Sequence, residues 1–292
     1  MFNLKNTLKD AISSAWIVMK LIIPLYILAD ILLYLHVLQN IAFIFEPITS
    51  LLDLPKETAL GIAAGMLFNL YAGIAFLAPL QLDGYQWSII AMFLGVAHSM
   101  PIENSVMKKL GISHIYSLTL RVSMAFLAVF FMQLLPESLF SHTIISDNTL
   151  RNHTHTSFFA MLKSSISLAM ILTIKVIVLV SSIIFLMAYL KSTKWMQRYQ
   201  QKVNSAFSIM AGLILGITYG AGILVHEAKT GALSRKEIFY IATFLMICHS
   251  VIEDVLLFVI FGANGWIVVS IRLAMAFVFS YLAVKIYEKV TR

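Results

Sequence analysis

The chain has 292 residues, of which 60% are hydrophobic and 12% are charged, and its formal net charge is +7. A soluble domain has about 45–50% apolar and about 25% charged residues, so this composition excludes a soluble protein and predicts an all-α polytopic membrane protein. The single Cys248 excludes an internal disulfide and a multi-thiolate metal site, and the basic excess is typical of cytoplasmic loops rather than of a nucleic-acid-binding surface.

Apolar segments long enough to enter a bilayer recur along the chain, four in each half. A membrane span needs about 20 residues at a rise of about 1.5 Å per residue. The first segment is too long for a signal-peptide core of about 7–15 residues, so we expect it to be a retained helix. The segments cover residues 15–38, 60–81, 86–107 and 115–135 in the first half, and 166–190, 205–225, 237–261 and 266–286 in the second.

The two halves repeat one another at a constant spacing. His98-Ser99 matches His249-Ser250, with 249 − 98 = 151, and "LRVSMAF" matches "IRLAMAF" at the same offset. Gly111 and Gly262 end matching segments, also 151 residues apart. This agreement predicts an internal duplication with a first repeat over residues 1–135, a polar inter-repeat loop over 136–156, and a second repeat over 157–292.

The second segment of each half is predicted to enter and leave the membrane on one side. If all four segments crossed, the halves would be parallel and the basic loop after residue 190 would lie outside, against the positive-inside rule. "NLYAG" and "TYGAG" supply glycine for a tight reversal, so we predict two re-entrant hairpins. Each half then has three transmembrane helices plus a hairpin, the repeats are inverted, and both termini are cytoplasmic. Inverted repeats are the usual construction of secondary transporters.

This topology sorts the charged residues by side. The basic residues expected inside are Lys5, Lys9, Lys108, Lys109, Lys191, Lys194, Arg198, Lys202, Arg235, Lys236, Lys285 and Lys289. The acidic residues expected outside are Asp53, Glu57, Asp83, Glu137 and Asp147.

Polar side chains interrupt the third segment of each half, in "GVAHSMPIENSV" and "MICHSVIEDVLL". Pro101 stands between His98 and Glu103 and predicts a broken helix, whereas His249 and Glu253 have the i,i+4 spacing of one helical face. An ionisable residue inside a membrane span is costly and marks a functional site by default. Because the repeats are inverted, we expect the two histidines and both hairpin tips to meet near the middle of the bilayer.

These groups predict a site for a small polar solute. Imidazole and carboxylate suit a divalent transition metal, so His98, Glu103, His249 and Glu253 are the predicted ligands of a metal ion carried as substrate, with no resident cofactor. The same donors and acceptors could instead bind a nucleoside. The wider predicted substrate-binding set adds Asp254, Asn69, Asn104, Tyr71 and Gly73, and from the second hairpin Thr218, Tyr219, Gly220 and Gly222.

A purely structural interpretation competes with this one. Ser250 to Glu253 fits the capping-box pattern, so the polar groups could only satisfy broken backbone. Arg121 and Arg272, again 151 residues apart, could snorkel to the membrane surface or clamp a substrate, or could pair with a hairpin-arm carboxylate or with backbone carbonyls. An intramembrane hydrolase is not expected, because neither a nucleophile elbow nor a metalloprotease motif is present.

The glycine-rich hairpin followed by a helix with a polar break, and "CHSVIED" above all, resembles the nucleoside recognition or gate domain. That domain occurs in the membrane part of bacterial ferrous-iron permeases, in spore maturation proteins and in stand-alone two-copy proteins. The resemblance covers roughly residues 60–135 and 205–286. The G-protein domain of the iron permeases is missing here, so nucleotide-driven iron uptake is not implied.

The resemblance and the residues together predict a secondary transporter or channel-like permease, with a divalent metal cation favoured. A nucleoside or other organic solute permease is one alternative. A non-transporting membrane component that assembles with a partner protein, as in the spore maturation proteins, is another. We further expect a location in the bacterial inner membrane, contact with lipid, and a homo-oligomer, with a dimer favoured.

Overall fold

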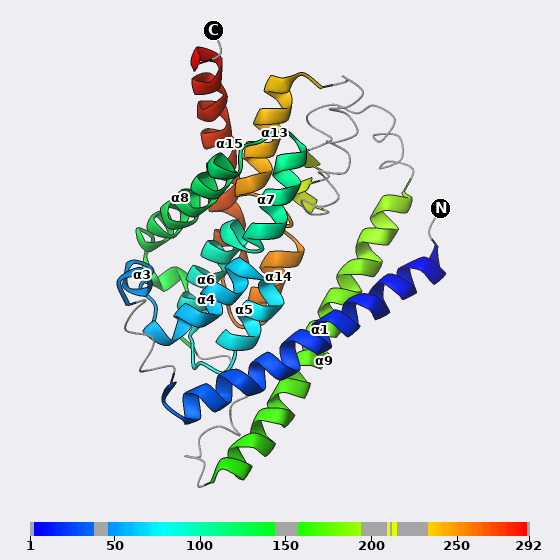
Figure 1. Ribbon diagram of the computed structural model, residues 1–292, viewed down its shortest axis with the longest axis vertical. Coiled ribbons are helices and arrows are strands. Elements are labelled where there is room, and N and C mark those ends of the chain that lie inside the picture. Colours follow the sequence, from blue (N-terminus) through cyan, green and yellow to red (C-terminus); the bar gives the residue numbers. More distant parts are fainter. Residues whose placement is uncertain are drawn as a thin grey trace.

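The computed structural model describes residues 3–37, 46–143, 157–193, 209–210, 212–214 and 233–290. These residues form helices and connecting turns, with no strand among them, which confirms the all-α fold (Figure 1). The helices of the first repeat are α1 (Leu4–Tyr34), α3 (Glu46–Leu51), η2 (Lys56–Thr58), α4 (Ala59–Leu67), α5 (Leu70–Leu77), α6 (Gly84–Ala97), α7 (Met100–Lys109) and α8 (His114–Gln133). They are followed by η3 (Glu137–Leu139), α9 (Phe158–Ser192), α13 (Arg235–Ile247), α14 (Glu253–Val259) and α15 (Gly265–Val290).

Five helical stretches in the described part are long and apolar enough to cross a membrane: 4–34, 84–109, 114–133, 158–190 and 265–289. The chain is therefore an integral membrane protein with several spans. Residues 194–208, which contain Lys194, Arg198 and Lys202, and the predicted second hairpin around 218–222 lie outside the described residues.

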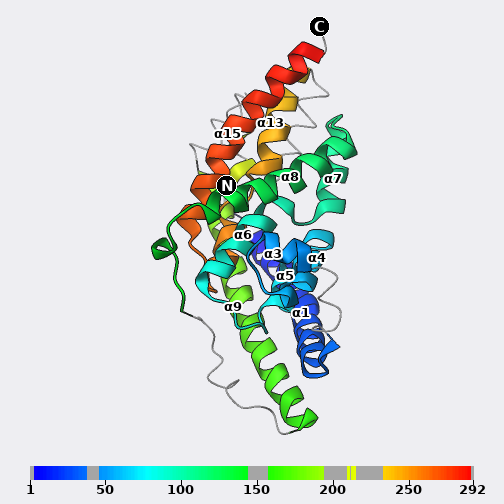
Figure 2. The same ribbon diagram turned by 90° about the vertical axis from the view of Figure 1, so that its left-hand side faces the viewer.

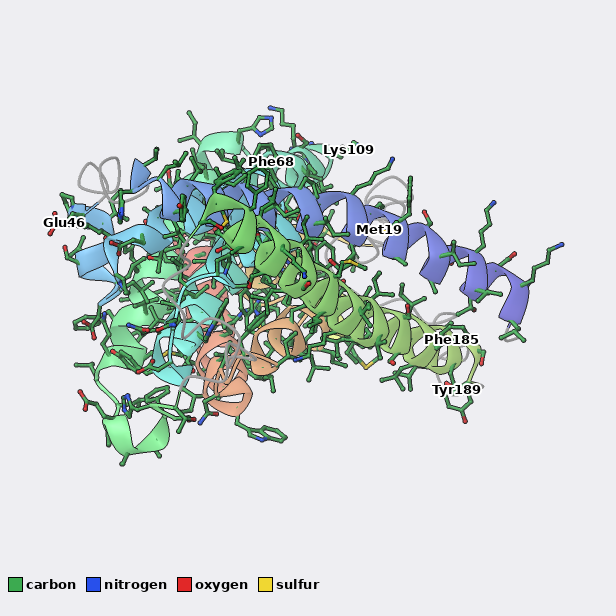
Figure 3. All side chains as sticks on the ribbon, turned by 90° about the horizontal axis from the view of Figure 1, so that it is seen from below. Met19, Glu46, Phe68, Lys109, Phe185 and Tyr189 are labelled. Carbon is green, nitrogen blue, oxygen red and sulfur yellow. The ribbon has the colours of Figure 1, made fainter. Side chains whose placement is uncertain are left out.

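The first helices of the two repeats, α1 and α9, pack against one another. Tyr34 at the end of α1 makes an edge-to-face ring contact with Phe158 at the start of α9, with centroids 5.9 Å apart, so the two helices run antiparallel. Figure 3 shows that they extend together beyond the other described helices, with Phe185 and Tyr189 near the projecting end of α9.

The first predicted hairpin is formed by α4 and α5. The reversal lies at Phe68-Asn69, where the extended Asn69 caps α5 by accepting a hydrogen bond from the Ala72 amide at 3.0 Å. Gly73, expected in the turn, lies instead within α5, where an added Cβ would stand 3.1 Å from the Gly61 carbonyl oxygen and 3.1 Å from the Gly65 Cα. These glycines therefore allow the two arms to pack closely, and they do not make the reversal itself.

The third predicted segment of each repeat is broken at the histidine. In the first repeat α6 ends at Ala97 and α7 begins at Met100; in the second, α13 ends at Ile247 and α14 begins only at Glu253. Ser99 and Ser250 have left-handed backbone, with φ of 49° and 48°. Only glycine, asparagine and aspartate adopt this conformation routinely, and its presence at the same position of both repeats shows that the two breaks share one backbone device.

The two broken helices run in opposite directions. Gly84, at the start of α6, packs so closely on Gly262, just past α14, that an added Cβ would lie 2.6 Å from the Gly262 carbonyl oxygen. At the other end, Tyr116 near the start of α8 hydrogen-bonds Thr243 in α13 at 2.9 Å. Figure 2 shows α13 and α15 side by side toward the end of the molecule that carries the C-terminus. The repeats are therefore inverted with respect to one another.

The same capping chemistry starts the broken helix in both repeats. Asp83 and Gln86 form a capping box at the start of α6, and Ser234 and Glu237 form one at the start of α13. Both pairs differ by 151 positions, since 234 − 83 and 237 − 86 give that number. A capping box satisfies two backbone amides that the helix leaves without partners, so each helix begins at a defined residue. His98 and His249 therefore follow the starts of their helices at the same distance along the chain.

Candidate functional site

Two histidines from opposite repeats face one another where the breaks meet. The rings of His98 and His249 are buried, with centroids 5.2 Å apart and planes inclined by 38°. Each Nδ1 is hydrogen-bonded to the backbone carbonyl oxygen of the residue four positions earlier. The distance is 2.8 Å from His98 Nδ1 to the Leu94 oxygen and 2.7 Å from His249 Nδ1 to the Leu245 oxygen. A carbonyl only accepts hydrogen bonds, so both Nδ1 atoms carry the proton. Each Nε2 is therefore the atom presented to the space between the repeats.

Two buried carboxylates lie beside the imidazoles. Glu103 Oε1 is 3.1 Å from His98 Nε2 and 3.4 Å from His249 Nε2. Asp254, which matches Glu103 at the offset of 151, places Oδ2 3.9 Å from His98 Nε2. The centre thus contains imidazole and carboxylate from each repeat, although the carboxylates differ in how they are held.

Three of these residues could hold a metal ion. One ligand atom each from His98, His249 and Asp254 lie within 4.8 Å of one another, and all three residues are buried. Asp254 Oδ2 and His249 Nε2 make no hydrogen bond within the described part of the chain. Burial of such atoms without a partner is unfavourable, so the arrangement suits a cation that would bind to both of them.

One carboxylate at this centre differs from the predicted metal ligands: Asp254, predicted only in the wider substrate-binding set, stands where Glu253 was expected. Glu253 was expected beside His249 because the i,i+4 spacing places both on one helical face. His249 instead lies in the break between α13 and α14, so the i,i+4 spacing does not place it on one helical face with Glu253. Glu253 turns away and accepts a hydrogen bond from the Tyr71 hydroxyl at 3.0 Å, while its neighbour Asp254 faces the histidines.

Arg121 holds the first break together. Its guanidinium is fully buried, and it donates to the carbonyls of Val96 at 2.8 Å and His98 at 2.7 Å. Its Nη2 also lies 2.8 Å from Glu103 Oε2. The last carbonyls of a helix lack intrahelical partners, so the arginine satisfies the backbone that the break exposes and fixes the Glu103 carboxylate at the same time.

Arg272 does the same for the second break, but it also reaches the first repeat. It donates to the carbonyls of Ile247 at 3.4 Å and His249 at 3.0 Å, which match the partners of Arg121. A third bond, at 2.6 Å, goes to the carbonyl of Gly95 in α6. Both arginines are 0% exposed, so backbone carbonyls and not the membrane surface are their partners.

The capping box proposed for the second break does not form. Ser250 takes the left-handed conformation, and the residue before α14 is Ile252, which makes no side-chain cap. The Ser250 carbonyl instead accepts from the Asp254 amide at 2.9 Å. The arginines and the histidine Nδ1 atoms therefore bond backbone carbonyls at the breaks, which leaves the two Nε2 atoms and the Asp254 carboxylate available for another role.

Other residues in the predicted set have local partners. Asn69 caps α5, Gly73 packs between the hairpin arms, and buried Asn104 accepts a hydrogen bond from the Ser117 hydroxyl of α8 at 2.5 Å. These contacts give each of them a structural role near the site. The four predicted residues of the second hairpin, Thr218, Tyr219, Gly220 and Gly222, lie outside the described residues.

Sequence reasoning left two features out of the site. Arg121 and Arg272 were not placed in it, although a matched pair of arginines in apolar helices at the offset of 151 was a usable signal. The bond between Tyr71 and Glu253 joins residues 182 positions apart in different repeats. No local pattern indicates it.

Comparison with known proteins shows similarity to a bacterial membrane protein. No family model matches the chain, and no solved structure matches it significantly. The chain is 24% identical over 274 residues to the uncharacterized membrane protein YvoD of Bacillus subtilis (strain 168), with 90% of this chain and 88% of that protein covered. The similarity extends over both repeats, and it supports the assignment of the chain to membrane proteins.

Proposed function

We propose that the chain is a secondary permease that moves a divalent metal cation through a site between its two inverted repeats. The observation that carries this proposal is the convergence of His98 Nε2, His249 Nε2 and an Asp254 carboxylate oxygen, all buried, where the two broken helices meet. Ionisable residues inside membrane-spanning segments line substrate and ion pathways in membrane proteins. Inverted repeats around one central site are typical of alternating access by rocking of one repeat against the other.

The size of the centre supports an ion rather than an organic solute. Nitrogen and oxygen ligands bind zinc-like ions at about 2.0–2.2 Å, which places two ligands of one ion about 3–4 Å apart. The three ligand atoms lie within 4.8 Å of one another, so a contraction of about 1 Å would complete the coordination. The two rings, with centroids 5.2 Å apart, leave no room between them for a base and a ribose.

The charges also support a cation. Glu103 is paired with Arg121 at 2.8 Å, and Arg272 is bonded to three carbonyls. Asp254 keeps a buried oxygen without a hydrogen bond, and no salt bridge to an arginine forms there among the described residues. A divalent cation would supply the counter-charge that this carboxylate lacks.

The orientation follows from the charge map of the loops. We place both termini at the cytoplasmic side of a bacterial inner membrane, with the basic ends of α7, α13 and α15 on that side and Asp53 and Asp83 outside. A homodimer in the lipid bilayer is the oligomeric state we propose.

The test is metal uptake by proteoliposomes that contain the purified protein. We expect the double variant His98→Ala with His249→Ala to abolish uptake of Co²⁺ or Zn²⁺, because it removes both nitrogen ligands. His114→Ala, which removes an exposed histidine at the start of α8, is the control and should transport normally. Unchanged uptake in the double variant would discard the assignment. Chelator-insensitive nucleoside uptake would favour the organic solute permease, and a stable co-purified protein without any flux would favour the partner-assembly role.

A further inference from the structure

The hairpin α4–α5 touches both breaks immediately beside the residues that would bind the ion. The Ser99 amide, directly after His98, donates to the Gly65 carbonyl of α4 at 3.0 Å. The Tyr71 hydroxyl of α5 donates to Glu253, directly before Asp254, at 3.0 Å. The hairpin therefore lies against the proposed ion site, with one of these hydrogen bonds to the break of its own repeat and the other to the second repeat.

The two hydrogen bonds differ in strength and in the parts of the chain that they join. The bond to Gly65 is a backbone contact within the first repeat. The bond from Tyr71 crosses to the second repeat and ends on a carboxylate, and hydrogen bonds to charged groups are worth more than neutral ones. Both Tyr71 and Glu253 are half-buried. Movement of the hairpin away from the second repeat therefore requires this bond to break.

The two arms of the hairpin pack closely enough to behave as one body. An added Cβ on Gly61 would lie 2.4 Å from the Leu77 side chain, and one on Gly73 would lie 3.1 Å from the Gly65 Cα. Such close packing of the arms transmits displacement rather than absorbing it. A change at the Tyr71 contact would shift α4 together with α5.

The first repeat has no hydrogen-bond acceptor in the side chain that matches Glu253. The position that matches Glu253 in the first repeat is Ile102, since 253 − 102 = 151, and it is 63% exposed. An isoleucine side chain accepts no hydrogen bond, whatever faces it. The inverted repeats therefore share their backbone design but not this contact.

We propose that the hydrogen bond between Tyr71 and Glu253 is a latch that holds the hairpin α4–α5 closed over one side of the ion site. The role of the latch in transport rests on the proposed function, whereas its effect on the position of the hairpin can be measured without any transport. Loss of a hydrogen bond to a charged group shifts the ratio of closed to open hairpin by about tenfold.

The position of the hairpin is measured directly by pulsed electron spin resonance between two spin labels. Phe68→Cys at the hairpin tip and Trp266→Cys at the start of α15 are exposed positions, and Cys248→Ala removes the single native cysteine. We expect one distance with Tyr71 intact and a second population at a different distance with Tyr71→Phe. Glu253→Gln should keep the single distance, because the glutamine oxygen still accepts the hydroxyl.

The matched control is Tyr116→Phe, which removes another tyrosine hydroxyl that joins the two repeats but does not lie on the hairpin. It should leave the label distance unchanged. If Tyr71→Phe behaves like this control, the latch is overturned, even when the wild-type protein carries metal. If Tyr71→Phe alone moves the hairpin while no variant transports metal, the latch stands and the proposed function fails.

Discussion

Gly95, at the start of the first polar interruption, is the position where a single added methyl group should weaken a contact between the two repeats. An alanine Cβ there would stand 2.9 Å from Arg272 Nη1 and 3.2 Å from its Cζ. Ordinary van der Waals contact begins near 3.4 Å, so the guanidinium must withdraw by about half an ångström. This withdrawal lengthens the 2.6 Å bond to the Gly95 carbonyl, which links Arg272 to the other repeat.

We expect Gly95→Ala to destabilise the folded protein by about 2 kcal/mol. Hydrogen bonds to charged groups contribute about 1.5–3 kcal/mol, and a fully buried guanidinium finds no water to replace the lost partner. Equilibrium unfolding of the purified protein in mixed micelles measures this difference. Met246 stands at the matching position of the second repeat, since 246 − 95 = 151, so the backbone there does not itself require glycine.

A double-mutant cycle with Arg272→Lys separates the clash from a general loss of packing. Lysine lacks the Nη1 atom that the alanine would meet, so Gly95→Ala should cost much less in the Arg272→Lys background. The coupling energy should therefore approach about 2 kcal/mol, within the range of about 0.5 to 3 kcal/mol found for contacting residues. Additivity of the two substitutions within about 0.5 kcal/mol would refute the reasoning.

Two further outcomes follow from the geometry. Asp254→Asn should weaken Co²⁺ binding in calorimetric titration at least about tenfold, whereas Glu253→Gln should change it less than about threefold; equal losses would return Glu253 to the ligand set. Gly84→Ala places a Cβ 2.6 Å from the Gly262 carbonyl oxygen, so its melting temperature should fall further than that of Gly111→Ala, which meets no atom within 4 Å and bears only the strain of φ +82°. Equal melting temperatures would show that the contact at Gly262 adjusts freely.

The duplication made much of the fold predictable. The offset of 151 pairs the histidines, the arginines and the glycines. In the structure both histidines contact the carbonyl four residues earlier, and both arginines donate to carbonyls at their own break. Gly111 and Gly262 both have positive φ, as expected after a helix end. The meeting of His98 and His249 follows from inversion, because a repeat and its inverted copy bring equivalent middle residues together.

The details of the breaks could not be predicted in the same way. The first break resumes helix at Met100 and the second only at Glu253, so a helical face drawn through His249 gives the wrong carboxylate. The hairpin reversal depends on the extended backbone of Asn69 and not on glycine. Both features are set by tertiary contacts, and neither the hydrophobic periodicity of the sequence nor its helix propensity encodes such contacts.

The asymmetry between the repeats explains why a carboxylate remains available at the centre. In the first repeat Arg121 pairs with Glu103 at 2.8 Å. In the second repeat the acid is the shorter Asp254, and Arg272 is drawn across to the carbonyl of Gly95. If Arg272 were paired with Asp254 as Arg121 is paired with Glu103, neither of these two carboxylates would be left to balance the charge of the proposed cation. Because Gly95 has no side chain, Arg272 can approach its carbonyl oxygen, and this contact between the repeats leaves the Asp254 carboxylate beside the histidines without a salt bridge to an arginine among the described residues.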